Sequence, residues 1–381
     1  MALRQNWANW LRYKTPAGTI TVHVDNDPKF DEITGTANPP LIKDIPVILA
    51  FQRLAGEREH VEISTIIENN PDLKNYLWGD GSGWFSASYG PFRRFTGGNR
   101  DYDNLFHSCP RLVPHLSVFG EDIALTECLN WFQTLYVRQL EGREDGKQLD
   151  YLKKFINEGG LLPHNTILEK VTSDGVIFRD GNGCEVLVEQ LSDGYRSILS
   201  ITFELIRQMI RSYNPDKVLC DIRHGRMKIT LPGVVLIDEI DAHLHPGWQR
   251  QVGHWFRKYF PKIQFIVTTH SPLICHASET GTVWKLPVSE DDFHSGRVQG
   301  TERKRLIYGS ILEAYDTELF GHNVTRSDAS KEKLKRLAIL NFKFLQGRLS
   351  YEEEKELNEL RAVLPITENI PQKEMSIDPP A

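Results

Sequence analysis

Three carboxylates follow a short apolar run in the second half of the chain. Residues 234–237 read Val-Val-Leu-Ile, which predicts a buried strand, and Asp238, Glu239 and Asp241 come directly after it. Ligands in open α/β sheets bind at the carboxyl ends of the strands, where these acids stand. Asp238 is a donor that suits Mg²⁺, and Glu239 can orient or deprotonate an attacking water. The alternative, a solvated acidic turn, is disfavoured by three acids within four positions.

A second apolar run also ends in polar residues. Residues 265–267 read Phe-Ile-Val, and Thr268, Thr269 and His270 follow. The run comes one strand–helix unit after Asp238, so the two predicted strands can be neighbours. His270 can then reach a phosphate and the water held by Glu239. The alternative is a structural histidine at the end of a strand.

A third segment, residues 191–197, reads Leu-Ser-Asp-Gly-Tyr-Arg-Ser and precedes a long predicted helix. Ser192 and Gly194 at a helix start expose backbone N–H groups and the positive end of the helix dipole, which suits a phosphate. The plainer interpretation is that Ser192 is an N-cap and Gly194 eases the turn.

Two histidines separated by one residue, His243 and His245, raise the question of a zinc site. No third and fourth ligand stands at a typical spacing, and Cys275 and His276 could join only through the fold. We therefore expect no zinc site.

The elements that must position these residues form a strand–helix–strand unit. Residues 246–259 predict a helix between the two apolar runs, with Pro246 at its first position. This order requires a parallel sheet, and the all-apolar runs predict central strands covered on both faces. The predicted fold class is α/β, an ABC-ATPase-like core with a mostly parallel sheet flanked by helices, a helical insertion and a helical C-terminal extension.

Other segments complete the expected organisation. Strands are predicted at residues 18–24, 45–51 and 84–94, a helical pattern over 124–159, a hairpin over 167–190 around a turn at 180–183, a long helix over 193–213, and a final helix pair over 330–346 and 351–364. Ser350 and Glu353 have the spacing of a capping box for the last helix.

Composition limits the class of protein. The 381 residues include 51 acidic and 45 basic side chains, which give a net charge of −6 and exclude a strongly cationic nucleic-acid-packaging protein. Five scattered cysteines without a Cys-x-x-Cys pair indicate reduced thiols and a cytoplasmic location. No apolar run approaches the ~18 residues of a membrane span, so we expect no membrane partner.

Taken together and in this order, the three segments resemble the ABC-type ATPases, in particular the soluble branch with the RecF, SMC and overcoming-lysogenization-defect enzymes. Residues 191–197 are similar to the signature loop, 234–239 to Walker B, 241–246 to the D-loop and 268–272 to the switch-histidine loop. The resemblance covers about residues 84–277. It implies ATP and Mg²⁺ as cofactors and a homodimer or higher oligomer around the nucleotide.

The resemblance also implies a role for each residue. Ser192 and Gly194 of one protomer would touch the γ-phosphate bound by the other, with Asp241 in the D-loop at the same nucleotide interface. Asp238 would hold the metal, and Glu239 and His270 would be catalytic on the nucleotide of their own chain.

Within this superfamily, residues 191–197 and 238–246 look like the stand-alone bacterial ATPases of phage defence, such as the ATPase subunit of Septu systems. That implies a separate effector, plausibly a nuclease acting on DNA, because no nuclease constellation is recognisable in this sequence. Residues 220–232 carry four basic side chains that are candidates for a phosphate-backbone or partner contact: Arg223, His224, Arg226 and Lys228. A solvated hairpin is the alternative for this segment.

One expected motif does not occur in the sequence. No Gly-x-x-x-x-Gly-Lys-Ser/Thr is present, so the lysine and backbone cradle for the β- and γ-phosphates are not recognisable. We weigh three explanations: an N-terminally shortened product, which we favour, a degenerate subunit that needs a complete partner, or another phosphate-binding segment.

The expected domains are a partial N-terminal ATPase lobe (1–100), a helical insertion (101–165), the ATPase core (166–300), a helical extension (301–365) and a disordered tail (366–381). An ATP-hydrolysing subunit is the leading functional hypothesis. A non-hydrolysing scaffold that binds protein partners is the alternative, and the membrane-transporter class is disfavoured by the form of residues 191–197.

Overall fold

A computed structural model describes the chain at residues 10–12, 15–31, 43–54, 61–67, 83–91, 111, 113–118, 127–287, 295–315, 317, 319–320 and 327–364. The chain divides into two compact units, residues 1–283 and residues 284–381. In the described part, no helix has the length and apolar character needed to cross a membrane. The predicted tail (366–381) and the arginine- and glycine-rich stretch 92–100 lie outside the described residues.

The first unit begins with an antiparallel meander. Its strands, of which the first two were predicted, are β1 (Ala17–Val24), β2 (Ile45–Arg53) and β3 (Val61–Ile67), in the order β1-β2-β3. Leu11, Phe51 and Val61 form a small core of their own on this sheet. Six of the eight positions of β1 are exposed.

The predicted helical region after residue 124 forms two helices, α3 (Glu127–Leu140) and α4 (Gln148–Glu158), joined through the short 3-10 helix η5 (Glu144–Lys147). The predicted hairpin is a three-stranded sheet of β5 (Ile167–Thr172), β6 (Gly175–Arg179) and β7 (Glu185–Leu187). The Asp180 carboxylate accepts the backbone N–H groups of Asn182 and Cys184 at 2.9 and 2.8 Å, which fixes the turn between β6 and β7.

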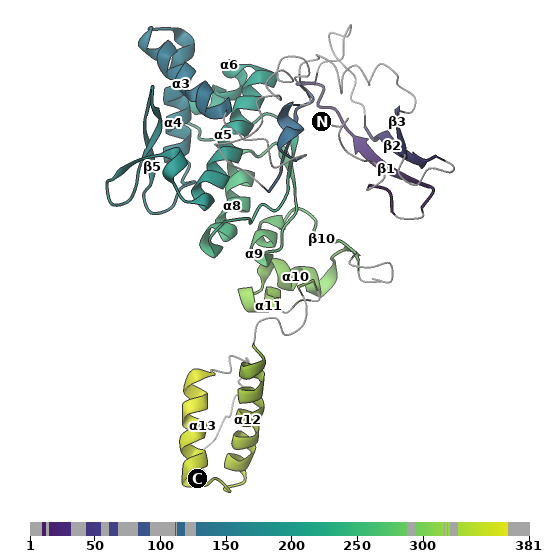
Figure 1. The fold of residues 1–381 in the computed structure, drawn as a ribbon, viewed down its shortest axis with the longest axis vertical. Coiled ribbons are helices and arrows are strands. Elements are labelled where there is room, and N and C mark those ends of the chain that lie inside the picture. Colours follow the sequence, from purple (N-terminus) through teal and green to yellow (C-terminus); the bar gives the residue numbers. More distant parts are fainter. Residues whose placement is uncertain are drawn as a thin grey trace, which may run out of the picture. The chain divides into compact units, whose positions relative to one another are not determined.

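The long helix α5 (Asp193–Tyr213) has the predicted bounds and lies in the core (Figure 1). It follows the 3-10 helix η6 (Val188–Gln190), and its buried residues continue around the helix from Ser197 to Ile210. Burial on all sides requires its polar groups to pair. The Glu204 carboxylate accordingly accepts two hydrogen bonds from Arg207, at 2.7 and 2.8 Å.

A parallel sheet of β4 (Ser86–Tyr89), β8 (Gly233–Ile237) and β9 (Ile263–Val267) forms the centre of the first unit, with β8 in the middle. Helix α8 (Pro246–Tyr259) connects β8 to β9 and starts with the predicted proline. Ala87, Val235 and Ile237 are buried against the helices in the main core. The α/β fold class with a parallel sheet flanked by helices is therefore confirmed.

The expectation that β8 and β9 are covered on both faces is wrong for this structure. Leu236 is 41% and Ile266 is 50% exposed, and they share one row of the sheet with Ser88. On that face the 3-10 helix η4 (Val113–Val118) lies against β4, where His115 bonds Ser86 and Ser88 at 3.0 and 2.9 Å. The side chains are apolar enough for burial, but the described elements cover only the β4 side.

The basic segment 220–232 is no hairpin. It contains the one-turn helix α7 (Cys220–Arg223) after α6 (Pro215–Val218) and then runs extended to β8. Arg223 pairs with Asp216 at 2.7 Å and Arg226 with Asp221 at 2.5 Å. Two of its four basic groups are therefore already matched by acids of the same chain.

The remaining described elements are short pieces after β9 and the helices of the second unit. They are α9 (Pro272–Cys275), η7 (His276–Ser278), β10 (Trp284–Lys285), β11 (Gly296–Arg297), α10 (Gly300–Tyr308), α11 (Ile311–Tyr315), α12 (Asp328–Leu345) and α13 (Tyr351–Val363). Helices α12 and α13 lie side by side (Figure 1) around Leu337, Leu340 and Leu357. The predicted capping box of Ser350 and Glu353 begins α13.

Candidate functional site

The parallel register brings two of the predicted segments to one edge of the sheet. Ile237 at the end of β8 pairs with Tyr89 of β4 and with Val267 of β9. The Asp238 N–H donates to the Tyr89 carbonyl at 2.8 Å, and the Thr268 N–H donates to the Ile237 carbonyl at 3.0 Å. The acidic loop (residues 238–245) and the His270 loop (residues 268–272) therefore leave the sheet as neighbours, as the sequence predicted.

The Thr268 hydroxyl joins these two loops. It donates to Asp238 Oδ1 at 2.5 Å and accepts the Glu239 N–H at 2.8 Å. Glu239 has a φ of 46°, in the left-handed region that costs a non-glycine residue about 1–2 kcal/mol. The bond to its amide holds this conformation, which turns the chain sharply after β8 and leaves the Glu239 side chain exposed.

Further hydrogen bonds fix the remainder of the acidic loop. The Ile240 N–H donates to the Thr268 carbonyl at 3.1 Å, and the Thr269 hydroxyl donates to the Asp241 carboxylate. His270 is exposed beside them at the same edge. The structure thus brings Asp238, Glu239 and Asp241 together with the loop that carries His270.

Gln249 in the first turn of α8 links the same two loops from the side. Its amide donates to the Leu244 carbonyl at 2.8 Å, and its carbonyl oxygen accepts the Ser271 hydroxyl at 2.7 Å. Sequence reasoning missed both Thr268 and Gln249 as parts of the site. For Thr268 a signal existed, since a hydroxyl directly after a strand stands at the ligand edge of the sheet.

The signature-like segment (residues 191–197) meets the acidic loop at Gly194. Ser192 is at the N-cap position of α5, yet it is exposed and makes no side-chain capping bond with the described residues. Gly194 is buried, and a Cβ there would lie 2.9 Å from the His243 carbonyl oxygen. Close packing against the acidic loop therefore explains why residue 194 is a glycine. The Ser192 hydroxyl is exposed and is accessible to a ligand.

The zinc interpretation finds no support. In the described residues, no group of three or more His, Cys, Asp and Glu side chains is arranged to hold a metal ion. His245 Nδ1 accepts the Gly247 N–H at 3.2 Å and so caps α8. Burial, with the Asp241 carboxylate nearby, raises the pKa of the Cys275 thiol to about 11.

The donor set at this edge does suit Mg²⁺ in its usual role with nucleotides. Mg²⁺ is commonly bound by one or two carboxylates together with phosphate oxygens and water. Asp238 offers an exposed carboxylate at a strand end, and the Thr268 hydroxyl orients it. In such a site, water and phosphate oxygens would supply the remaining ligands.

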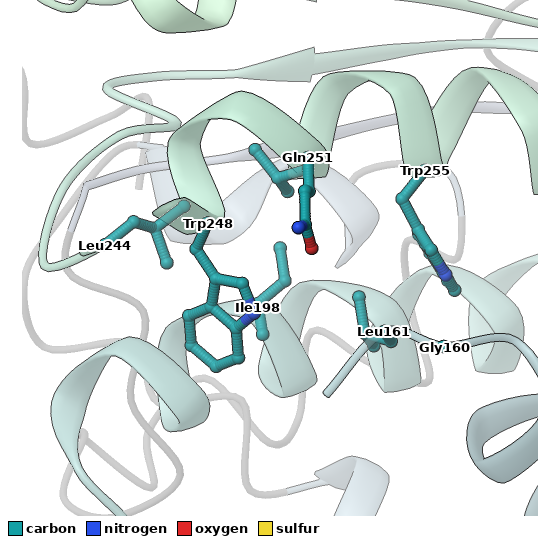
Figure 2. A pocket seen from close by; sticks show the side chains of 8 residues that line it. Gly160, Leu161, Ile198, Leu244, Trp248, Gln251 and Trp255 are labelled. Carbon is teal, nitrogen blue, oxygen red and sulfur yellow. The ribbon is translucent and has the colours of Figure 1, made fainter. Parts of the chain in front are cut away.

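A shallow apolar pocket lies close to this edge, between α5 and α8 (Figure 2). It is lined by Gly160, Leu161, Ile198, Leu244, Trp248, Gln251, Val252 and Trp255. The lining is almost entirely apolar. It includes Leu244 of the acidic loop but none of the predicted site residues.

Comparison with known proteins agrees with this geometry. Residues 110–276 match the family described as "AAA domain, putative AbiEii toxin, Type IV TA system". The chain resembles the ABC-type AAA ATPases of anti-phage defence. The matched region contains the signature-like segment, the acidic loop and the His270 loop.

Individual relatives each match part of the chain. The "Retron Ec83 probable ATPase" of Escherichia coli is 38% identical over 181 residues, which are 44% of this chain and 31% of that protein. The "Septu protein PtuA" of Bacillus thuringiensis is 33% identical over 135 residues, 35% of this chain and 32% of that protein. The chain thus matches about a third of the length of these relatives.

A solved SMC head domain, bound to the C-winged helix domain of ScpA, is 12% identical and covers 67% of this chain and 66% of its own, with a TM-score of 0.34. Because a match with so low a TM-score does not establish the fold, we assign the α/β fold class from the parallel β4-β8-β9 sheet of this chain.

Proposed function

We propose that this chain is an ATP-binding and ATP-hydrolysing subunit of ABC-like type that acts in anti-phage defence. One observation carries the proposal: Asp238, Glu239 and His270 lie at the carboxyl ends of two adjacent parallel strands, with the Thr268 hydroxyl bonded to both acidic residues. Carboxylates at such an edge suit a nucleotide-bound metal and a water that attacks a phosphate.

Each residue then has a role in the proposal. Asp238 holds Mg²⁺, Glu239 positions and deprotonates the attacking water, and His270 contacts the transferred phosphate. Ser192 and Gly194 act on the nucleotide of a second protomer, with Asp241 at the same interface, so ATP joins two copies. One relative is named a retron probable ATPase and another a Septu protein, which supports an ATPase of phage defence. The proposal includes a separate effector, a nuclease that acts on DNA.

The test is calorimetry with Mg-ATP, followed by phosphate release. It compares the present chain with any longer product of the same gene. At least one of the two forms should bind and hydrolyse ATP. In that form, Glu239→Gln should still bind ATP but lose at least about a hundredfold in the rate of hydrolysis, in the range expected of a general base. Glu185→Gln, an exposed glutamate on β7, is the matched control and should behave as wild type.

The alternative is a non-hydrolysing scaffold, and the sequence feature that favours it is the missing Gly-x-x-x-x-Gly-Lys-Ser/Thr motif. It predicts no ATP binding by any form of the protein, no change of assembly with nucleotide, and no effect of His270→Ala. Absence of binding in all forms would overturn the ATPase proposal and favour this one.

A further inference from the structure

The first turn of α8 touches the signature-like segment through an aromatic pair. The rings of Tyr195 and Trp248 lie edge to face with centroids 4.6 Å apart and planes at 63°. The Tyr195 hydroxyl lies 3.3 Å from the Thr166 hydroxyl and donates to the Pro163 carbonyl at 3.4 Å. Gly194 packs beside the pair, since a Cβ there would lie 3.3 Å from the Trp248 ring.

On its far side, Trp248 is held less firmly. Figure 2 shows its ring extending from α8 towards Ile198 of α5, at the edge of the apolar pocket. The indole N–H is buried and has no hydrogen-bond partner in the described part of the chain. Because no polar bond anchors the indole in the described part of the chain, its position is set by packing, against residues 194 and 195 on one side and Ile198 on the other.

The next residue, Gln249, points to different neighbours. It bonds the Leu244 carbonyl of the acidic loop and the Ser271 hydroxyl of the His270 loop, at 2.8 and 2.7 Å. The Ser271 hydroxyl also accepts the Leu273 N–H at 3.2 Å. Two consecutive residues of one rigid helical turn thus contact the signature-like segment on one side and both loops of the acidic edge on the other.

We propose that Trp248 and Gln249 are positioning residues that transmit a displacement of residues 192–195 to the His270 loop of the same chain. The functional meaning rests on the proposed ATPase. There, the signature-like segment engages the nucleotide of the second protomer, and the His270 loop acts on the nucleotide of its own chain. The first turn of α8 then makes each site sensitive to occupation of the other.

The competing interpretation is ordinary core packing, in which a change at Tyr195 disturbs only its immediate neighbours. The two differ at residues 268–273, none of which takes part in the hydrogen bonds or the ring contact of Tyr195 described above. Amide hydrogen exchange of the nucleotide-free full chain separates them, and its outcome does not depend on whether ATP binds.

Four variants make the test. Tyr195→Leu removes the ring and keeps apolar bulk, Gln249→Met removes both hydrogen bonds and keeps the shape, and the double variant combines them. Tyr151→Leu, another half-buried tyrosine, is the matched control. Coupling between contacting groups of about 1 kcal/mol corresponds to an about fivefold change in an opening equilibrium.

We expect Tyr195→Leu to speed exchange in residues 268–273 about fivefold, as coupling of that size predicts, and to have no such effect in the Gln249→Met background. Tyr151→Leu should leave these amides unchanged. An effect of Tyr195→Leu confined to residues 191–198 and 243–252, or an equal effect with and without Gln249, would overturn the proposal. Exchange of the β5–β7 sheet reports global unfolding. If Tyr195→Leu raises it, Tyr195→Met, which also removes the ring, replaces that variant and the same criteria apply.

Discussion

Replacing Thr268 by valine tests whether its hydroxyl holds the acidic edge together. Valine has the same shape and removes two hydrogen bonds, one to the Asp238 carboxylate and one from the Glu239 N–H. A bond to a charged group contributes about 1.5–3 kcal/mol and a neutral one about 0.5–1.5 kcal/mol. Both lie at an exposed edge, where water replaces part of the loss, so we expect the free energy of unfolding to fall by about 1.5 kcal/mol.

The assay is urea unfolding followed by far-UV circular dichroism, with two comparison variants. Thr268→Ser keeps the hydroxyl and should remain within about 0.5 kcal/mol of wild type. Thr134→Val on α3 removes only a bond to the Asn130 carbonyl of its own helix, and it should also cost no more than about 0.5 kcal/mol. If Thr268→Val is as stable as Thr268→Ser, the hydroxyl does not hold the edge and this account of the Glu239 backbone is incorrect.

Two further predictions concern buried groups. Burial lowers the pKa of His115 from 6.5 to about 4, so the unfolded chain binds more protons between these values; the free energy of unfolding should fall by about 2 kcal/mol from pH 7 to pH 5. In urea unfolding His115→Gln should lose most of this dependence, and an unchanged slope would contradict the assignment. For the thiols, a maleimide at pH 7 followed by peptide mass spectrometry should label exposed Cys184 rapidly, and Cys275, which is buried and has a raised pKa, only after unfolding. Comparable rates in the native protein would count against the burial of Cys275.

The sequence predicts the main elements of the site well, because their signals are local. Helix α8 begins at the proline that suits a first helical position, and α5 begins directly after the Ser192 N-cap. The apolar run before Asp238 identifies β8, and the strand–helix–strand order implies its parallel pairing with β9. These features need no knowledge of distant contacts.

What the sequence does not reveal depends on distant contacts. The approach of Gly194 to the His243 carbonyl joins residues 49 positions apart, and the Ser271–Gln249 bond depends on how α8 turns relative to β9. The exposure of Leu236 was also mispredicted, because an all-apolar strand has the same sequence pattern whether one or both of its faces are covered. The roles assigned to Asp238, Glu239 and His270 remain predictions.

The order of the central sheet has a consequence for synthesis of the protein on the ribosome. Ser86 of β4 pairs with Val234 of β8, 148 positions later, whereas β5, β6 and β7 pair with their sequence neighbours. At about 5–20 residues per second, β4 waits roughly 7–30 s for its partner strand to be made. During that time the local sheet and helices α3 to α5 can form first, and β4 stays unpaired, a state prone to misassembly. Slowing translation after residue 213 should therefore lower the yield of native protein more than slowing it after residue 287.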